Sequence, residues 1–268
     1  MRSRSSASPV LLLHGQPGSA RDWTRVVRAL DGAAAHVAPI AIDRPGWDGA
    51  TLPRDLAGNA AAALATLDAR GIERATVVGH SLGGGVAAWL AAHHPERVSA
   101  LVLAAPAANR ASLEWLDRWL TVPVAGGLTS AASLTGLGLA LSAGPLRQRI
   151  ARASALDEDY LRAAGRALLS ARVRRAFDAE QRSLVHDLPV LEDRLTEVRA
   201  PTWILTGSAD RVIPAAAPRR LAEQIPGARL VVLARAGHLL PQLQARRVTE
   251  TIELALDAGR SRRDRSSA

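Results

Sequence analysis

The 268-residue sequence contains no cysteine and no lysine. Without cysteine there is no disulfide framework, no thiolate nucleophile and no cysteine-based zinc site, so packing alone must stabilise the fold. Without lysine there is no Schiff-base lysine and no P-loop lysine. Only 3% of the residues are aromatic, which leaves few platforms on which nucleic acid bases could stack. These absences exclude several enzyme chemistries and leave serine as the clearest candidate nucleophile.

The charge is strongly basic, with 34 arginines against 25 acidic residues and a formal net charge of +9. Such a balance raises the question of a nucleic acid or anionic membrane partner. Five of the net charges lie in residues 1–8 and 259–268, which are rich in Ser and Arg and are expected to be disordered tails. No nucleic acid partner is therefore expected, and attachment of the tails to nucleic acid or to a membrane is the weaker binding hypothesis. No signal-peptide pattern follows the first arginines, which favours a cytoplasmic location.

Short apolar runs alternate with helical patterns through most of the chain, and 48% of the residues are apolar. Strands are expected at residues 10–13, 36–42, 75–78, 98–103, 202–206 and 230–233, and helices after Ser19 and at 56–68 and 82–92. Strands alternating with helices of this length indicate βαβ units. The expected fold class is α/β, with a mostly parallel, doubly wound sheet.

The strand pattern is interrupted by a long helical stretch. The expected domains are an α/β core at 9–108 and 197–258 and a helical lid, or cap, inserted at 109–196. Within the insertion, residues 119–146 form a run of 28 residues without a charged side chain. That length is compatible with a membrane span, but an apolar lid is favoured, because prolines and glycines are expected to break the run into short helical pieces. These residues are Pro123, Gly126, Gly127, Gly136, Gly138, Gly144 and Pro145.

The sharpest motif is Gly79-His80-Ser81-Leu82-Gly83, which lies between an expected strand and an expected helix. In that context a G-x-S-x-G pentapeptide predicts a nucleophile elbow, in which the serine takes a strained backbone conformation and the glycines permit close approach of neighbouring segments. The helix that follows offers backbone N–H groups to a developing negative charge. Ser81 is therefore the candidate nucleophile.

With this elbow, the sequence resembles the α/β-hydrolase family over most of residues 9–258. The segment His14-Gly15-Gln16-Pro17-Gly18 is similar to the family's oxyanion loop. The resemblance implies that the backbone N–H groups of Gln16 and Leu82 form the oxyanion hole. His14 is interpreted as a structural histidine that fixes the loop.

The acid and the base of a serine triad follow the nucleophile in this family, in the order Ser, Asp or Glu, His. Asp210 follows the expected strand at 202–206, and His238 follows the last expected strand in a segment similar to the family's catalytic histidine loop. The implied triad is Ser81, Asp210 and His238. No histidine spacing suggests a metal site, and no cofactor is implied.

Two further features bear on this resemblance. Asp43 and Arg44 follow the second strand and are interpreted as residues that brace a loop, because Asp43 precedes Ser81 in the chain. Family members usually begin with an antiparallel pair of strands, whereas only eight residues precede Pro9 here. Either the sheet lacks these two edge strands or translation starts upstream of Met1.

The leading functional hypothesis is a serine hydrolase that forms an acyl-enzyme with a small to medium apolar carboxylic ester. Trp115 and Trp119 in the lid, with His186, are the candidate substrate-binding residues. The alternatives are carbon–carbon bond hydrolysis as in meta-cleavage hydrolases, a cofactor-free perhydrolase, and a non-catalytic ligand receptor on the same fold. Carbon–carbon bond hydrolysis would use lid arginines for a substrate carboxylate. These are Arg172, Arg174 and Arg175.

Overall fold

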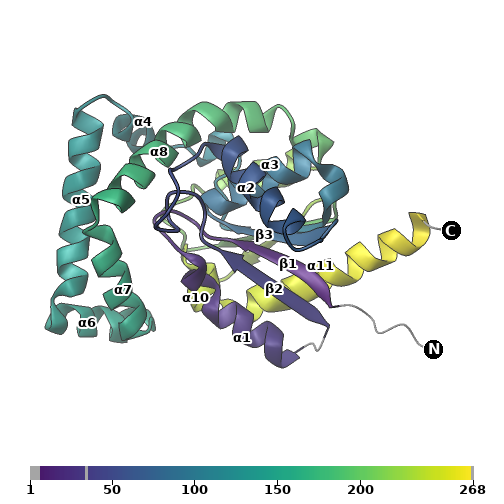
Figure 1. Ribbon diagram of the computed structural model, residues 1–268, viewed down its shortest axis with the longest axis horizontal. Helices are drawn as coiled ribbons and strands as arrows, with labels where there is room; N and C mark the ends of the chain where they lie inside the picture. Colours follow the sequence, from purple (N-terminus) through teal and green to yellow (C-terminus); the bar gives the residue numbers. More distant parts are fainter. Residues whose placement is uncertain (1–6, 34–35, 267–268) are drawn as a thin grey trace.

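The computed structural model describes residues 7–33 and 36–266. Six strands form one sheet in the order β2-β1-β3-β4-β5-β6, and every neighbouring pair is parallel. The strands are β1 (Ser8–Leu13), β2 (Val37–Ile42), β3 (Ala75–His80), β4 (Val98–Ala104), β5 (Thr202–Gly207) and β6 (Arg229–Leu233). The expected parallel, doubly wound α/β sheet is confirmed (Figure 1). Within the described residues no strand precedes β1, so the family's antiparallel pair is absent there.

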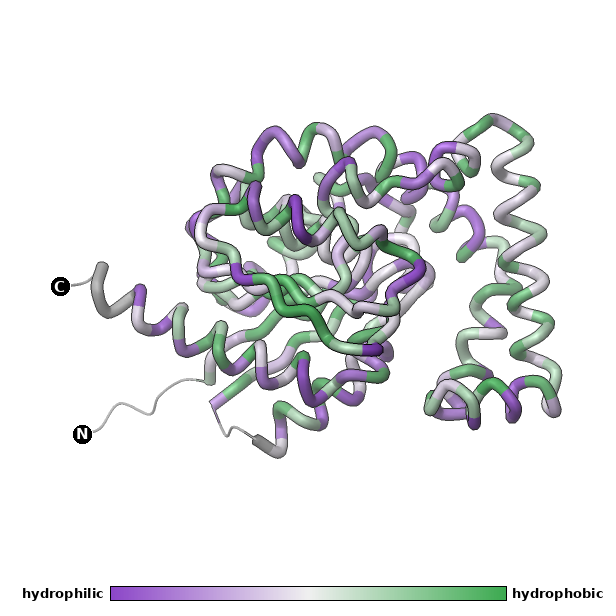
Figure 2. Tube along the Cα trace, turned by 180° about the vertical axis from the view of Figure 1, so that it is seen from behind, coloured by the Kyte–Doolittle hydropathy of each residue, from purple (hydrophilic) through white to green (hydrophobic). Residues whose placement is uncertain are grey.

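The inner strands β1, β3, β4 and β5 are formed by apolar runs that are buried on both faces along most of their length, whereas the edge strands β2 and β6 are only partly buried. In β1, Val10 and Leu12 pack into one hydrophobic cluster, and Leu11 and Leu13 pack into a second cluster on the other face. The strands are accordingly among the most hydrophobic parts of the chain in Figure 2. The sheet therefore separates two cores, and each core is covered by its own layer of helices.

One layer contains α2 (Leu56–Asp68), α3 (Leu82–His93), α9 (Ala216–Gln224) and the second half of α8 (Ala171–Glu192). The other layer contains α1 (Thr24–Ala33), α10 (Leu240–Leu243) and α11 (Ala245–Ser266). Short 3-10 turns at Ala20–Trp23, Pro95–Arg97, Arg110–Ser112 and Leu195–Glu197 complete the connections.

The strand order places a crevice between β1 and β3. Strand β1 connects to β2 on one side, whereas the chain continues from β3 towards β6 on the other side. Open α/β sheets bind ligands at such a switch point, outside the carboxyl ends of the strands. The loop after β1 begins at His14 and the loop after β3 contains Ser81, so both expected motifs lie at this crevice.

Between β4 and β5 the described chain is helical, with α4 (Trp115–Leu120), α5 (Ala125–Ser142), α6 (Gly144–Ser154), α7 (Glu158–Leu168) and α8. Helices α4 to α7 lie to one side of the sheet, and α8 returns over it (Figure 1). They enclose a small hydrophobic cluster of their own, formed by Leu134, Leu141, Leu161 and Leu168. The proposed domain boundaries remain a prediction. No helix of the described chain is long and apolar enough to cross a membrane.

The expectation that prolines and glycines break residues 119–146 into short helical pieces is right only in part, because the run is divided between α4 and α5, around Pro123, and between α5 and α6, before Gly144, but not within α5. Helix α5 runs unbroken for 18 residues through four of these glycines. Gly138 lies against Gly165 of α7, where an added Cβ would come within 3.1 Å of the Gly165 carbonyl oxygen. The close packing of α5 on α7 offsets the low helix propensity of glycine.

The expectation of a disordered carboxyl-terminal tail is wrong for residues 259–266, which continue α11 as a helix. Arginine is a good helix former, and the side chains of Arg260 and Arg262 donate hydrogen bonds to Ser8 Oγ and to the Arg199 carbonyl oxygen. At the other end, Ser8 belongs to β1. Residues 1–6 and 267–268 lie outside the described residues.

Candidate active site

Ser81 occupies a sharp turn between β3 and α3. Its backbone has φ 53° and ψ −122°, a conformation that costs a non-glycine residue free energy and that the expected elbow requires. The turn is anchored to the end of β4, because the Ser81 N–H donates to the Ala104 carbonyl oxygen at 3.1 Å and the Ser81 carbonyl accepts from the Ala107 N–H at 3.0 Å. The side chain is therefore presented at the carboxyl edge of the sheet by backbone contacts.

The flanking glycines explain how the backbone can turn so tightly. A Cβ at position 79 would lie 2.1 Å from the Gly83 carbonyl oxygen. A Cβ at position 83 would lie 2.3 Å from the Leu13 carbonyl oxygen, at the end of β1. Both distances are far below contact distance, so the start of α3 packs against β1 and β3 only because these residues lack side chains.

His238 and Asp210 meet at the same edge of the sheet. Asp210 follows β5 and His238 follows β6. The His238 Nδ1 lies 2.9 Å from Asp210 Oδ2, and Asp210 Oδ1 accepts from the backbone N–H groups of Val212 and Ile213. Nδ1–H donates to the carboxylate, which leaves Nε2 as the ring nitrogen that can accept a proton.

The environment of Asp210 favours its ionised form. Burial raises the pKa of this carboxyl group, but the hydrogen bond and the charge of His238, with the two backbone N–H donors, outweigh burial and lower the pKa below its ordinary value. A carboxylate held in this way keeps the His238 ring in one tautomer and one orientation.

His80, the neighbour of Ser81, supports the His238 loop. Its Nε2 lies 3.0 Å from the His238 carbonyl oxygen, and the two rings are 4.9 Å apart between centroids. Burial and the nearby His238 lower the pKa of His80 to about 3, so its ring is neutral and Nε2–H is the donor. The sequence does not indicate this contact, because no pattern relates His80 to a loop 158 residues away.

The loop after β1 lies against Ser81. A Cβ at Gly15 would be 2.9 Å from the Ser81 Cβ, so only glycine permits this approach. Within the described residues, neither the Gln16 N–H nor the Leu82 N–H donates to a protein acceptor. Both expected oxyanion donors therefore remain free to bind an oxygen atom at the crevice.

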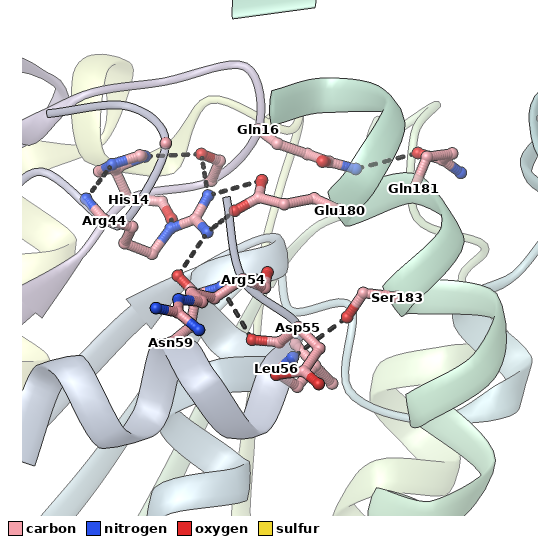
Figure 3. A network of polar contacts seen from close by, with 12 residues as sticks. His14, Gln16, Arg44, Arg54, Asp55, Leu56, Asn59, Glu180, Gln181 and Ser183 are labelled. Carbon is pink, nitrogen blue, oxygen red and sulfur yellow. Dashed lines mark hydrogen bonds and ion pairs between the residues drawn. The ribbon is translucent and has the colours of Figure 1, made fainter. Parts of the chain in front are cut away.

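His14 and Arg44 fix this loop (Figure 3). The Arg44 N–H donates to His14 Nε2 at 3.0 Å, and His14 Nδ1 lies 2.7 Å from the Gly15 carbonyl oxygen. Burial and the Arg44 charge lower the pKa of His14 well below its ordinary value, so the ring is neutral and Nδ1–H donates to Gly15. This arrangement agrees with the interpretation of His14 as a structural residue.

Arg44 pairs with Glu180 of α8, and only 1% of each side chain is exposed. The Arg44 guanidinium also donates to Asn59 Oδ1 and to the carbonyl oxygens of His14 and Gly15. Burial raises the pKa of Glu180, and the Arg44 charge opposes this shift. The sequence predicted that Arg44 braces a loop but did not indicate Glu180, because nothing in the pattern relates two residues 136 positions apart.

Within the described residues, no hydrogen bond or ion pair joins the three candidate substrate-binding residues to Ser81, Asp210 or His238. Trp115 is 75% exposed on α4, and Trp119 is 44% exposed and donates from Nε1 to Thr129 Oγ1. The His186 side chain is 86% exposed and lies beside Asp187. It borders a surface hollow that none of the three triad candidates lines.

A cavity of about 240 Å³ lies between the chain that follows the loop after β1 and α7, and none of Ser81, Asp210 and His238 lines it. Most of its lining is apolar: Pro17, Gly18, Trp47, Ala163, Ala164, Ala167, Leu168 and Val173, with Ser19, Arg21, Asp22 and Tyr160 as the polar members. Tyr160 donates to Asp22 Oδ1 at 3.0 Å and accepts from Gln242 Nε2 at 3.2 Å. This polar cluster joins α7 to the 3-10 turn at Ala20–Trp23 and to α10.

A sequence model of the alpha/beta hydrolase fold matches residues 8–241. The chain belongs to this family. It is 31% identical, over 85% of its length and 80% of the relative, to a 2-hydroxy-6-oxononadienedioate/2-hydroxy-6-oxononatrienedioate hydrolase of Paraburkholderia phymatum.

Solved structures show the same fold. A thermophilic esterase from Thermogutta terrifontis matches with a TM-score of 0.73 at 23% identity, over 95% of this chain and 91% of that one. A meta-cleavage product hydrolase from Pseudomonas fluorescens matches with a TM-score of 0.68 at 23% identity, over 94% of this chain and 92% of that one. At these identities the structures establish the fold alone.

Proposed function

We propose that the protein hydrolyses small to medium apolar carboxylic esters through an acyl-enzyme on Ser81. Hydrolysis is the activity class of this family and of its named relatives. The observation that carries the proposal is the His238–Asp210 hydrogen bond of 2.9 Å at the sheet edge that presents the strained Ser81. Nucleophile, base and orienting acid then come from three separate loops at one edge, as a triad requires.

In this mechanism His238 Nε2 takes the Ser81 Oγ proton while Oγ attacks the ester carbonyl carbon. Asp210 stabilises the imidazolium that forms. The Gln16 and Leu82 N–H groups bind the oxyanion of the tetrahedral intermediate, and the amino end of α3 adds its dipole. His238 then protonates the leaving alcohol. In the second half of the reaction His238 takes a proton from water, whose oxygen attacks the acyl carbonyl carbon, and gives this proton to Ser81 Oγ as the carboxylic acid leaves.

A mostly apolar cavity lies beside the expected oxyanion loop, and although none of the three triad candidates lines it, its composition favours an apolar substrate of limited size. Its volume of about 240 Å³ is slightly below the range of roughly 300–1,000 Å³ that is usual for ligand pockets. Its apolar wall comes mainly from α7, in the helical segment proposed as a lid. The exposed positions of Trp115, Trp119 and His186 make them weaker candidates for substrate contacts than this wall.

The test combines a fluorophosphonate probe with p-nitrophenyl esters of increasing acyl length, using wild type and Ser81→Ala. We expect wild type to be labelled and to prefer short to medium chains, and Ser81→Ala to lose labelling and roughly 10⁴- to 10⁶-fold in kcat. Equal labelling of both proteins would refute the role of Ser81.

Carbon–carbon bond hydrolysis is the second candidate, and the relative from Paraburkholderia phymatum favours it. Its named substrate has no ester bond, so its hydrolysis must cleave a carbon–carbon bond. Of the arginines expected to hold a substrate carboxylate, Arg172 and Arg175 are exposed, and Arg174 donates to the Leu169 carbonyl oxygen. We therefore place ester hydrolysis first. A 2-hydroxy-6-oxodienoate assayed beside the esters distinguishes the two, because faster turnover of the dienoate would reverse this order.

A further inference from the structure

The Arg44–Glu180 pair connects the helical segment between β4 and β5 to the loop that carries one expected oxyanion donor. Glu180 lies in the middle of α8, and Arg44 lies in the loop after β2 (Figure 3). Removing two charges from water costs several kcal/mol per ion, so a buried pair is a poor means of stabilising a fold. The pair does, however, fix one specific segment of backbone. The Arg44 guanidinium donates to two consecutive carbonyl groups, those of His14 and Gly15, at 2.9 Å each.

The second of these carbonyls belongs to the peptide unit that contains the Gln16 N–H. In a trans peptide the C=O and N–H groups point in opposite directions. The Gly15 carbonyl oxygen is held from one side by Arg44 Nη2 and by His14 Nδ1. The Gln16 N–H must therefore point away from the guanidinium. Since Gly15 itself lies against Ser81 and this N–H donates to no protein acceptor in the described chain, Arg44 sets the direction of the oxyanion donor.

Helix α8 contacts the same loop a second time, through the residue after Glu180. Gln16 Nε2 donates to Gln181 Oε1 at 2.9 Å, and Gln181 Nε2 donates to Asp117 Oδ1 of α4 at 2.7 Å. Two consecutive residues of α8 thus hold the backbone and the side chain of one loop. A movement of α8 would move the donor as well.

We propose that Glu180 is a positioning residue for the hydrolytic step: by holding the Arg44 guanidinium, it orients the Gly15–Gln16 peptide towards the oxyanion. This inference rests on the proposed function, because it assigns a purpose to the geometry of that site. Glu180 does not touch the substrate. It acts through Arg44 and couples the helical segment to the reactivity of Ser81.

The test compares Glu180→Gln with Glu192→Gln, a matched control on the same helix. Glu192 accepts hydrogen bonds from the Arg110 N–H and from Gln224 Nε2, so it also anchors α8, but away from the oxyanion loop. With p-nitrophenyl butyrate, we expect Glu180→Gln to lower kcat roughly 10- to 100-fold with little change in KM, because a displaced donor weakens the transition state and not substrate binding. Titration with the fluorophosphonate normalises kcat to the competent fraction. The control should keep the kcat of wild type.

A second measurement does not depend on activity. Hydrogen–deuterium exchange of the peptide that covers residues 11–18 should be faster in Glu180→Gln than in wild type or Glu192→Gln, because the loop has lost its anchor. Unchanged exchange would overturn the inference. If Ser81→Ala retained activity, the proposed function would fail, while the exchange result would still decide whether Glu180 holds the loop.

The double variant Arg44→Met with Glu180→Leu separates positioning from stability. It removes both charges together, so no charge is left buried alone and the fold is expected to persist. We expect it to lose kcat at least as strongly as Glu180→Gln. A folded double variant with the kcat of wild type would overturn the proposal, as would a rise of kcat in Glu180→Gln.

Discussion

The two sides of the candidate oxyanion site are held in different ways. On the elbow side, Leu82 follows Ser81 at the start of α3, and backbone contacts of glycines with β1 and β3 set its position. On the loop side, Gln16 is held by side chains that come from the loop after β2 and from α8. The elbow should therefore be sensitive to a single methyl group, and the loop should be sensitive to charge.

The largest expected effect is on kcat, and it follows from a change to the proposed base and its orienting acid, which act together with both sides of the candidate oxyanion site. Asp210→Asn removes the carboxylate that orients His238, and a neutral amide can stabilise the wrong tautomer of the ring. We expect kcat for p-nitrophenyl butyrate to fall about 10⁴-fold, with the fold intact. Steady-state kinetics and circular dichroism check this result. A loss below 10-fold would mean that Asp210 does not orient the base.

The next largest effect is on stability, and it follows from removing a buried charge that holds the loop side. Arg44→Met leaves Glu180 buried without its partner, which is expected to lower the free energy of unfolding by about 3–5 kcal/mol. Chemical denaturation measures the change. Arg70→Met is the control, because the Arg70 side chain is exposed and, among the described residues, donates only to the Thr66 carbonyl oxygen. Equal stability of the two variants would show that the buried pair is not needed to hold the loop.

On the elbow side, we expect an added side-chain atom to destabilise the fold because there is no space for it. Gly83→Ala places a Cβ 2.3 Å from the Leu13 carbonyl oxygen, so backbone must move against backbone. We expect a loss of about 3 kcal/mol in the free energy of unfolding, near the upper end for overpacking. Gly127→Ala is the matched control, because a Cβ there meets no atom within 4 Å and alanine favours a helix. Similar denaturation midpoints for the two variants would contradict the account of the elbow.

The smallest effect depends on pH and again concerns the loop side. Burial raises the pKa of Asp22 from 3.8 to about 6, although the hydrogen bond from Tyr160 opposes this shift. Its favourable contribution to stability is thus present in full below pH 3.8 and lost as the pH rises through 6. Relative to Asp22→Asn, wild type should lose at most about 3 kcal/mol of unfolding free energy between pH 4 and 7.

Asp48 provides a control of opposite sign for this pH dependence. Burial raises the pKa of Asp48, but the hydrogen bonds from Thr51 and Ala50 together outweigh burial and lower the pKa below its ordinary value. Relative to Asp48→Asn, wild type should therefore gain stability as the pH rises through the acidic range. Denaturation at several pH values measures both differences. A difference for Asp22 that does not change with pH would contradict the raised pKa.

The elements that depend on local pattern were predictable. Helix α2 spans the expected residues 56–68, and the strands differ from expectation by one or two residues at their ends. The elbow at Ser81 was readable because the G-x-S-x-G spacing reports a backbone constraint within five residues. The segment of α5 was predicted to be helical but its unbroken length was not, because the packing of Gly138 on Gly165 belongs to a pair of helices and not to either sequence segment. The helical end of α11 was missed because its arginines were interpreted as charge alone.

Hydrophobic periodicity and glycine positions act over a few residues, so the sequence by itself determined the α/β fold and the elbow at Ser81, and the resemblance of its motifs to a known family indicated that family and the candidates Asp210 and His238. Only the tertiary structure decided how the oxyanion loop is held. Arg44 and Glu180 meet across 136 positions, and His80 meets the His238 carbonyl oxygen across 158. Such contacts form only after the strands have paired. Ion pairs and hydrogen bonds between distant segments produce no recognisable spacing of residues in the sequence.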